Sequence, residues 1–213
     1  MRTRVPNAFV RDGRIYTVNL ASGAVYGERI VRQGGREYRE WSPARSKLAE
    51  YLRAGGPFPA AEDDGILYLG AGSGTTVSHV SDVLRSGTVY AVEVAPIPYF
   101  RLLEVAGSRP NVVPILSDAR HPERFSPLVG PVAGVYQDLA QRDQVNIFAA
   151  NMGAFGARWG ILMLKTRSIS QRDPDEVAAA ELAKLEDLSV SHVDISGTHP
   201  DHRAYFVAAE PSG

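Results

Sequence analysis

The sequence predicts an α/β protein in which a mostly parallel sheet is covered by helices, with a small antiparallel β domain in front of it. Three observations predict this fold. From residue 66 onwards short apolar runs alternate with segments of helical periodicity, the first run leads into a glycine-rich turn, and residues 8–41 show apolar/polar alternation instead. Alternating strands and helices are typical of a parallel sheet with right-handed crossovers. We therefore divide the chain into a β-rich domain with a linking helix, residues 1–54, and a larger domain, residues 55–213.

Length and composition exclude several classes of protein. A chain of 213 residues with 44% hydrophobic residues is long enough to bury a sizeable core. No apolar run approaches the ~20 residues that a membrane span needs, and residues 1–7 lack the apolar core of a signal peptide. We therefore expect a cytoplasmic protein with no membrane span. The absence of cysteine excludes disulfides, a thiolate nucleophile and cysteine-ligated zinc.

The charge is unevenly distributed. The net charge is −1, but residues 1–53 hold 11 Lys and Arg against 5 Asp and Glu. A basic end is compatible with contact to a polyanion, and equally with an ordinary solvated surface.

The small domain is predicted from alternation and turn residues. Residues 8–41 read as consecutive hairpins punctuated by Asp12-Gly13, Ser22-Gly23 and Gly34-Gly35. A sheet of about 40 residues is marginal alone, so we expect it to pack on the larger domain. Ser42 followed by Pro43 predicts the start of a helix that ends at Gly55.

The larger domain follows from the same periodicities. Apolar runs predict strands at residues 66–69, 88–92, 112–116, 132–136 and 161–164. Helical spacing predicts helices from the glycine turn to Gly87 and at residues 98–106, 144–154 and 174–188. Two closely spaced runs at the end predict an antiparallel strand pair, residues 190–195 and 204–209.

The glycine turn is the predicted cofactor site. Gly70, Gly72 and Gly74 form a G-x-G-x-G pattern, which lets backbone N–H groups approach a ligand at the positive end of the following helix. Thr75 stands where the dinucleotide fingerprint needs its third glycine, which disfavours NAD and FAD, and no G-K-[ST] follows, which excludes a P-loop. The spacing resembles the loop of class I S-adenosylmethionine-dependent methyltransferases. The alternative is a tight strand-to-helix connection without a ligand.

Polar residues end four successive strands, at the edge where open α/β sheets bind ligands. Glu93 is placed to accept from ribose hydroxyls and Asp118 from an adenine amino group; Asp138 and Lys165 share one pocket if their strands are neighbours. Taken singly, each of these residues has an alternative role as a helix cap or surface residue.

Lysine usage adds to this pattern. The chain has 20 Arg but only three Lys, at positions 47, 165 and 184. Arginine suffices for plain positive charge and cannot act as a base. Lys47 and Lys165 are therefore predicted to have a chemical role, whereas Lys184 lies on the polar face of the last predicted helix and is expected to be solvated.

Long runs of the sequence resemble the fibrillarin family of RNA ribose 2′-O-methyltransferases, in the archaeal form without an arginine-glycine-rich tail. These runs are Tyr38–Trp41, Arg45–Leu48, Leu67–Ala71, Ser73–Asp82, Tyr90–Glu93, Asp118–Pro122, and Asp138 with Ala140 and Gln141. The sequence departs from the family pattern at Gly72, at Leu139 and Arg142, and at Arg203 after His202.

The resemblance implies a class I, Rossmann-like fold with a seven-stranded sheet, and S-adenosylmethionine as the cofactor. The implied catalytic residues are Lys47, Asp138, Lys165 and His202. The implied cofactor contacts are Gly70, Ala71, Thr75, Thr76, Glu93, Val94, Asp118, Ala119, Asp138, Leu139, Ala140 and Gln141. His199 and His202 form an H-x-x-H pair, but no third ligand is apparent and we predict no metal.

The resemblance also implies partners. A box C/D guide RNA would pair with rRNA or tRNA, and a Nop-domain scaffold protein, with a kink-turn-binding ribosomal-type protein on the guide, would hold the enzyme at the paired site. The near-neutral charge and the absence of a recognisable RNA-binding module agree with targeting by partners.

In the predicted reaction Lys165 is the base, Asp138 orients it, Lys47 acts electrostatically and His202 orients substrate or relays the proton. Two other functions stay open at this point. One is a stand-alone small-molecule methyltransferase, and the other is a non-catalytic structural subunit of the ribonucleoprotein.

Overall fold

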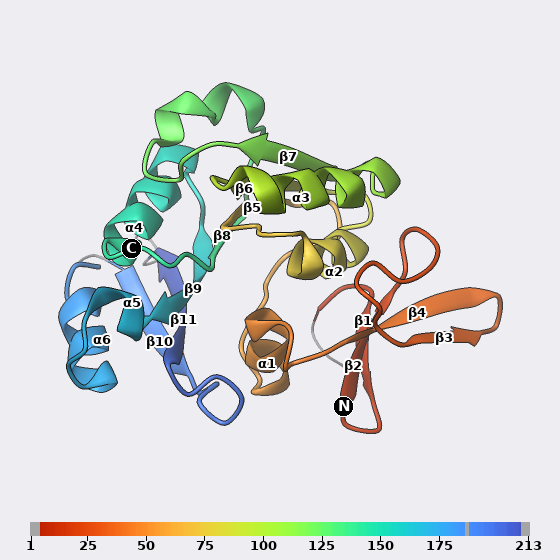
Figure 1. The fold of residues 1–213 in the computed structure, drawn as a ribbon, viewed down its shortest axis with the longest axis horizontal. Helices are drawn as coiled ribbons and strands as arrows, with labels where there is room; N and C mark the ends of the chain where they lie inside the picture. Colours follow the sequence, from red (N-terminus) through yellow and green to blue (C-terminus); the bar gives the residue numbers. More distant parts are fainter. Residues whose placement is uncertain (1–4, 186–187, 210–213) are drawn as a thin grey trace.

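Two sheets organise the molecule (Figure 1). The structure is a computed structural model and describes residues 5–185 and 188–209. The small sheet is antiparallel, with strand order β1-β2-β4-β3, and consists of β1 (Ala8–Arg11), β2 (Arg14–Val18), β3 (Ile30–Gln33) and β4 (Arg36–Trp41). The hairpins at Asp12-Gly13 and Gly34-Gly35 are confirmed by the registers of β1 with β2 and of β3 with β4.

The predicted hairpin at Ser22-Gly23 is wrong. Strand β2 pairs with β4 rather than with β3, so β4 lies between them. The connecting loop is held by side chains instead of a two-residue turn: Asn19 Nδ2 donates to the Gly23 carbonyl at 3.0 Å, and the Gly23 N–H donates to Glu37 Oε1 at 2.7 Å. A turn dipeptide alone does not show which strand becomes the neighbour.

The linking helix α1 (Lys47–Arg53) begins later than predicted. Its N-cap is Ser46, whose Oγ accepts from the Ala49 N–H at 3.3 Å. The backbone carbonyl of Ser42 instead accepts from the Arg45 N–H at 3.1 Å and makes a turn. Both serines suit a cap in sequence, but only Ser46 directly precedes residues whose apolar face reaches the core.

The large sheet has seven strands in the order β10-β11-β9-β8-β5-β6-β7, parallel except where β11 pairs with β9 and β10. The sequence predicts this sheet, including the antiparallel strand pair at its end. Its strands are β5 (Gly65–Leu69), β6 (Thr88–Glu93), β7 (Val112–Leu116), β8 (Gly134–Gln137), β9 (Trp159–Lys165), β10 (Leu188–Val193) and β11 (His202–Ala209). Its helices are α2 (Thr75–Val83), α3 (Pro96–Ser108), α4 (Gln144–Phe155), α5 (Thr166–Ile169) and α6 (Pro174–Leu182), with 3₁₀ turns η1 (Pro122–Arg124) and η2 (Ser126–Leu128).

The last predicted helix is too long. Helix α6 ends at Leu182, and β10 starts at Leu188, whereas the sequence predicts a helix that continues to residue 188. The reason is sheet pairing: Leu188 is registered opposite Ala209 in the hairpin of β10 and β11. The short helix α5 and the two 3₁₀ turns were not predicted.

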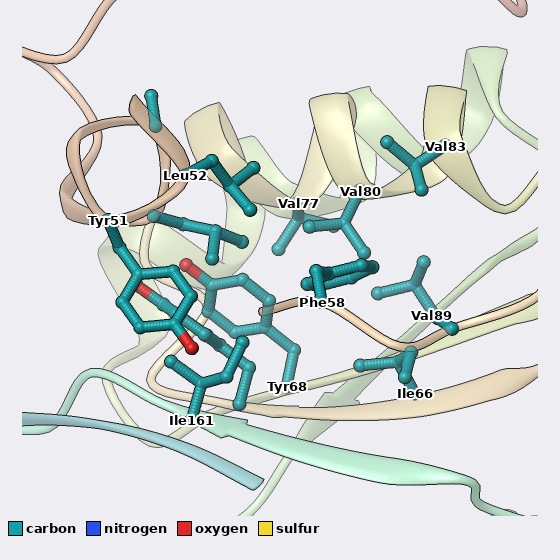
Figure 2. Packing of buried hydrophobic residues seen from close by; sticks show 14 of the residues in the cluster. Tyr51, Leu52, Phe58, Ile66, Tyr68, Val77, Val80, Val83, Val89 and Ile161 are labelled. Carbon is teal, nitrogen blue, oxygen red and sulfur yellow. The ribbon is translucent and has the colours of Figure 1, made fainter. Parts of the chain in front are cut away.

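Each face of the large sheet has its own core. Along β5, Ile66 and Tyr68 join the cluster under α1, α2 and α3, whereas Leu67 and Leu69 join the cluster under α4 and α6. This period-two division is what a strand buried on both faces requires. Figure 2 shows the first cluster, with Tyr51 from α1 and Val77 and Val80 from α2 directed toward Tyr68 and Ile66.

The small sheet packs on α2 largely through polar side chains. Asp82 accepts from Arg39 Nη1 at 2.8 Å, from Arg109 Nη1 at 2.6 Å and from Thr17 Oγ1 at 2.7 Å. His79 stacks on Trp41 with ring centroids 5.0 Å apart. Because these side chains are buried, residues 5–54 and the large sheet share one continuous interior. The boundary at residue 54 stays a prediction. Within the described residues, no helix combines the length and apolar character that crossing a bilayer requires.

Candidate active site

The glycine turn between β5 and α2 lies against the end of β8. Gly70 has φ +82°, and a Cβ there would lie 2.6 Å from the Asp138 carbonyl oxygen. Gly74 has φ +85°, and a Cβ there would lie 2.9 Å from Val105 of α3. Glycine is required at both positions for conformation and for space. Because Gly70 has only a hydrogen in place of a side chain, the turn can lie close to the backbone of Asp138.

A pocket opens between this turn and the carboxyl ends of β6, β7 and β8. Its lining includes seven of the predicted cofactor contacts: Gly70, Glu93, Val94, Asp118, Ala119, Leu139 and Gln141. Glu93 is buried, and its two carboxylate oxygens each accept a backbone N–H, from Gly72 and from Ala95, both at 2.8 Å. A carboxylate oxygen has a second acceptor site. Glu93 is thus fixed in orientation and still able to accept from a ligand.

Asp118 is held by a neighbouring arginine. Arg120 donates to both carboxylate oxygens, with its shortest contact from Nη2 to Oδ2 at 2.6 Å. Hydrogen bonds from the Arg120 side chain are the largest cause of a pKa of Asp118 below its usual value, despite an opposing contribution from burial. A ligand amino group at Asp118 therefore meets an ionised carboxylate that it must share with Arg120.

Two lysines converge on Asp138 beside the pocket. Lys47 Nζ donates to Asp138 Oδ2 at 2.9 Å, and Lys165 Nζ lies 2.8 Å from Oδ1 and donates to the Asp138 carbonyl at 3.2 Å. The three side chains are 17–21% exposed, so solvent or a substrate can reach them. The sequence predicts that Asp138 and Lys165 share one pocket if their strands are neighbours; β8 does pair with β9, and the two side chains are in contact. Lys47 joins them from the first residue of α1.

The charge state of Asp138 follows from its surroundings. Burial raises the pKa of this carboxyl, but the charges and hydrogen bonds of Lys165 and Lys47 lower it by more, and the net pKa is below the usual value. Beneath it lie Tyr68 and Tyr136, with ring centroids 4.6 Å apart. Burial raises the pKa of both phenols, which are therefore neutral, and the ionised Asp138 is surrounded by two cations and two neutral rings.

His202 completes this end of the sheet. It is the register partner of Lys165 in the β9–β11 pair. Burial and the charge of Lys47 lower its pKa to about 4, so its imidazole is neutral at pH 7. The neighbouring His199 donates from Nε2 to the Pro43 carbonyl at 2.9 Å, which ties the loop before His202 to the linker before Lys47.

Other predicted contacts lie outside the pocket lining. Ala71 is buried beneath the turn, and Ala140 is exposed between two lining residues. The hydroxyls of Thr76 and Ser46 are hydrogen-bonded to each other at 3.0 Å, and Thr75 lines a separate hollow on the side of α3. Their contact with cofactor stays a prediction.

Ser46 was not singled out from the sequence. Its Oγ, which is buried, accepts from Trp41 Nε1 at 3.0 Å and from the N–H of Ala49, and it is also hydrogen-bonded to the hydroxyl of Thr76. It joins the helix that carries Lys47 to the glycine turn. The available signal was its position directly before Lys47 in a resembling run. Among the described residues, no group of three or more His, Asp or Glu is arranged to hold a metal ion.

Comparisons with known proteins agree with this architecture. The family model described as Fibrillarin matches residues 2–210. A fibrillarin-like rRNA/tRNA 2′-O-methyltransferase of Thermoplasma acidophilum is 44% identical over 200 residues, covering 92% of this chain and 87% of the relative.

Three solved structures are also similar over most of both chains. They are a fibrillarin of Methanococcus jannaschii (TM-score 0.90, 37% identity, 97% of this chain and 96% of that one), a fibrillarin/Nop5p complex (0.88, 38%, 95% and 97%) and the Aeropyrum pernix fibrillarin with natively bound S-adenosyl-L-methionine (0.84, 43%, 92% and 89%). The chain belongs to the fibrillarin family.

Proposed function

We propose that this chain methylates the ribose 2′-hydroxyl of rRNA and tRNA with S-adenosylmethionine, as the catalytic subunit of a box C/D ribonucleoprotein. The observation that carries the proposal is the Lys47–Asp138–Lys165 cluster, which stands at the edge of the pocket beside the glycine turn. The relatives named as rRNA/tRNA 2′-O-methyltransferases support the choice of substrate.

The pocket residues fit S-adenosylmethionine. Gly70 leaves room where a side chain would collide with Asp138, and the first turn of α2 has no side-chain cap, so its N–H groups are available to an anionic group. Glu93 would accept from ribose hydroxyls, and Asp118 from the adenine amino group. The bound cofactor would supply a methyl group made electrophilic by a sulfonium.

The chain's task is then to remove a proton from a weak nucleophile. Lys165, held against both a side-chain and a backbone oxygen of Asp138, would accept the hydroxyl proton as its neutral amine. Lys47 contacts the other carboxylate oxygen of Asp138, at 2.9 Å. Lys47 would also stabilise the negative charge that develops on the oxygen.

His202 has a narrower role. Since its imidazole is neutral at pH 7, it accepts or donates a hydrogen bond without adding a third positive charge to the cluster. This suits orientation of the substrate ribose or relay of a proton from Lys165.

The proposed partners are supported by a similar protein of known structure and by the net charge of the chain. A solved relative is a fibrillarin bound to Nop5p, which supports a Nop-domain scaffold for this chain. The guide RNA and a kink-turn-binding protein follow from the same proposal. A net charge of −1 gives little sequence-independent affinity for RNA, so a scaffold and guide would select the target.

Transfer of a tritiated methyl group to RNA tests the proposal. The isolated chain should methylate RNA poorly and without a preferred site, and the assembled particle should modify a single guided ribose. Site-specific methylation by the chain alone contradicts guidance. Failure of the complete particle, with cofactor bound, would indicate a structural subunit, and transfer to small hydroxyl compounds would indicate a stand-alone methyltransferase.

A further inference from the structure

A second basic site lies on the other side of the glycine turn. The arginine hollow is bounded by the small domain, the start of α2 and the outer part of α3, and its lining includes Arg45, Ser73, Thr75, Arg101, Glu104 and Arg109. Figure 1 shows α2 and α3 side by side, with α1 and the small sheet beyond α2. Three arginines against one glutamate, together with several hydroxyl side chains, make a lining suited to an oxyanion.

Two of the arginines are fixed in place. Arg45 donates from Nη1 to the Tyr26 carbonyl at 3.1 Å, and its guanidinium lies 4.8 Å from the centre of the Tyr26 ring. Arg109 is fully buried and pairs with Asp82 and Asn19, but its Nε–H has no partner in the part of the chain that the structure describes. A buried donor without a partner is costly, and Arg109 is one of the residues that line the hollow.

Arg101 is free to bind. It is exposed on α3 and, among the described residues, has no ion pair or side-chain hydrogen bond, and the same holds for Glu104. Neither charge is used to hold the fold. The fixed arginines and the free one therefore provide a partly preorganised site.

The hollow adjoins the proposed catalytic cluster. Arg45 precedes Lys47 by two residues, and Thr75 precedes Thr76, which is bonded to Ser46. An anion in the hollow would thus lie directly beyond the segments that carry Lys47 and the glycine turn. A strand whose ribose entered the cluster would carry its neighbouring phosphates past this place.

We propose that the arginine hollow binds a backbone phosphate of the RNA strand that is methylated. This inference rests on the proposed function, whose target is an RNA ribose. Binding a phosphate here gives no sequence specificity but fixes the strand's position and direction, as phosphate contacts do in other nucleic-acid complexes. The same oxyanion chemistry fits the carboxylate of the cofactor, so the test must separate the two.

The test measures binding of the full-length chain to a short labelled single-stranded RNA by fluorescence anisotropy, from low to moderate salt. Arg101→Gln should weaken binding about fivefold at 0.1 M salt and reduce the slope of log affinity against log salt by about 0.7, the value for one lost phosphate contact on a single strand. Glu104→Gln removes repulsion and should tighten binding. The matched control is Arg85→Gln, an exposed arginine beyond the opposite end of α2, which should change nothing.

Calorimetry with S-adenosylmethionine on the same variants completes the design, and all should bind it as the unsubstituted chain does. Opposite effects of Arg101→Gln and Glu104→Gln on RNA, with unchanged cofactor binding, would support the proposal. Weaker cofactor binding by Arg101→Gln assigns the hollow to the cofactor instead. Equal effects at Arg101 and Arg85, or RNA binding that is absent or unchanged in every variant, overturn it. These outcomes do not depend on methyl transfer, so a failed methylation assay tests the proposed function alone.

Discussion

Two clusters in this molecule have the same plan, an aspartate between two cations with a histidine nearby. In the first, Asp82 lies between Arg39 and Arg109 at the junction of the small sheet and α2, at 2.8 and 2.6 Å. In the second, Asp138 lies between Lys47 and Lys165, at 2.9 and 2.8 Å. The first is fully buried, whereas the side chains of the second are 17–21% exposed.

The choice of cation matches the difference in exposure. Arg39 reaches Glu28, Asp82 and two oxygens of Ser78, a set of partners that only a guanidinium with several directed donors can satisfy. Lysine makes fewer bonds but can lose its proton. An arginine-based cluster therefore suits a permanent junction between domains, and a lysine-based cluster at the edge of a pocket suits proton transfer.

The largest expected effect is on turnover. Lys165→Arg keeps the positive charge but cannot become a neutral base, so single-turnover methylation in the assembled particle should fall by about 10²–10⁴. Cofactor affinity, measured by calorimetry, should survive. A near-normal rate would make Lys165 purely electrostatic and leave Lys47 or Asp138 to be tested as the proton acceptor.

Lys184→Arg is the matched control. Lys184 pairs with Glu181 at 2.7 Å just beyond α6 and has no proposed role in the reaction. Its replacement should leave rate, cofactor affinity and stability unchanged.

The second effect is on stability. Asp82→Asn removes the charge between two buried arginines, and breaking such a pair costs about 3–5 kcal/mol. Urea unfolding should show this loss in the free energy of unfolding, while the folded fraction still binds cofactor. A loss below about 1 kcal/mol would mean that the arginines find other partners and that the two clusters differ less than their geometry implies.

A third carboxylate, Glu93, forms no ion pair within the described part of the chain and tests the pocket itself. It is oriented by two backbone N–H groups. Glu93→Ala removes an acceptor for the ribose hydroxyls at a cost of about 1–3 kcal/mol, which corresponds to cofactor binding about 5- to 150-fold weaker. Calorimetry that shows unchanged affinity would remove Glu93 from the site.

The smallest effect concerns the two histidines. Burial lowers the pKa of His79 beside Asp82, and burial with the charge of Lys47 lowers that of His202 beside Asp138 to about 4. Each is neutral in the folded protein and takes up a proton more readily when unfolded, near pH 6.5. Stability is therefore unaffected by them above about pH 6.5 and should fall as pH decreases toward 4.

His202→Gln removes the histidine beside the lysine cluster and so isolates its contribution to the pH dependence of stability. The free energy of unfolding of this variant, measured between pH 7 and pH 4.5, should fall less steeply than that of the unsubstituted chain. Identical slopes would show that His202 titrates alike in the folded and unfolded chain.

Much of the fold and part of the candidate site could be predicted from local sequence. Strand β7 has the predicted bounds, and the strand–glycine turn–helix unit lies where its spacing indicates. Asp138 and Lys165 come together because parallel strands end at one edge of a sheet. The role of each site residue toward cofactor and substrate stays a prediction, and so does the cytoplasmic location.

By itself, the sequence determined most of the segments that form strands and helices, the polar residues Glu93 and Lys165 that end β6 and β9, and the family to which the chain belongs. Periodicity and turn chemistry act over a few residues, which is why they can be read without a structure. The tertiary structure decided the rest: the place of β4 between β2 and β3, the end of α6, the cap at Ser46, and the partners of Asp82. Arg39 reaches Asp82 across 43 positions, and no local pattern states which buried cation will meet which carboxylate until packing brings them together.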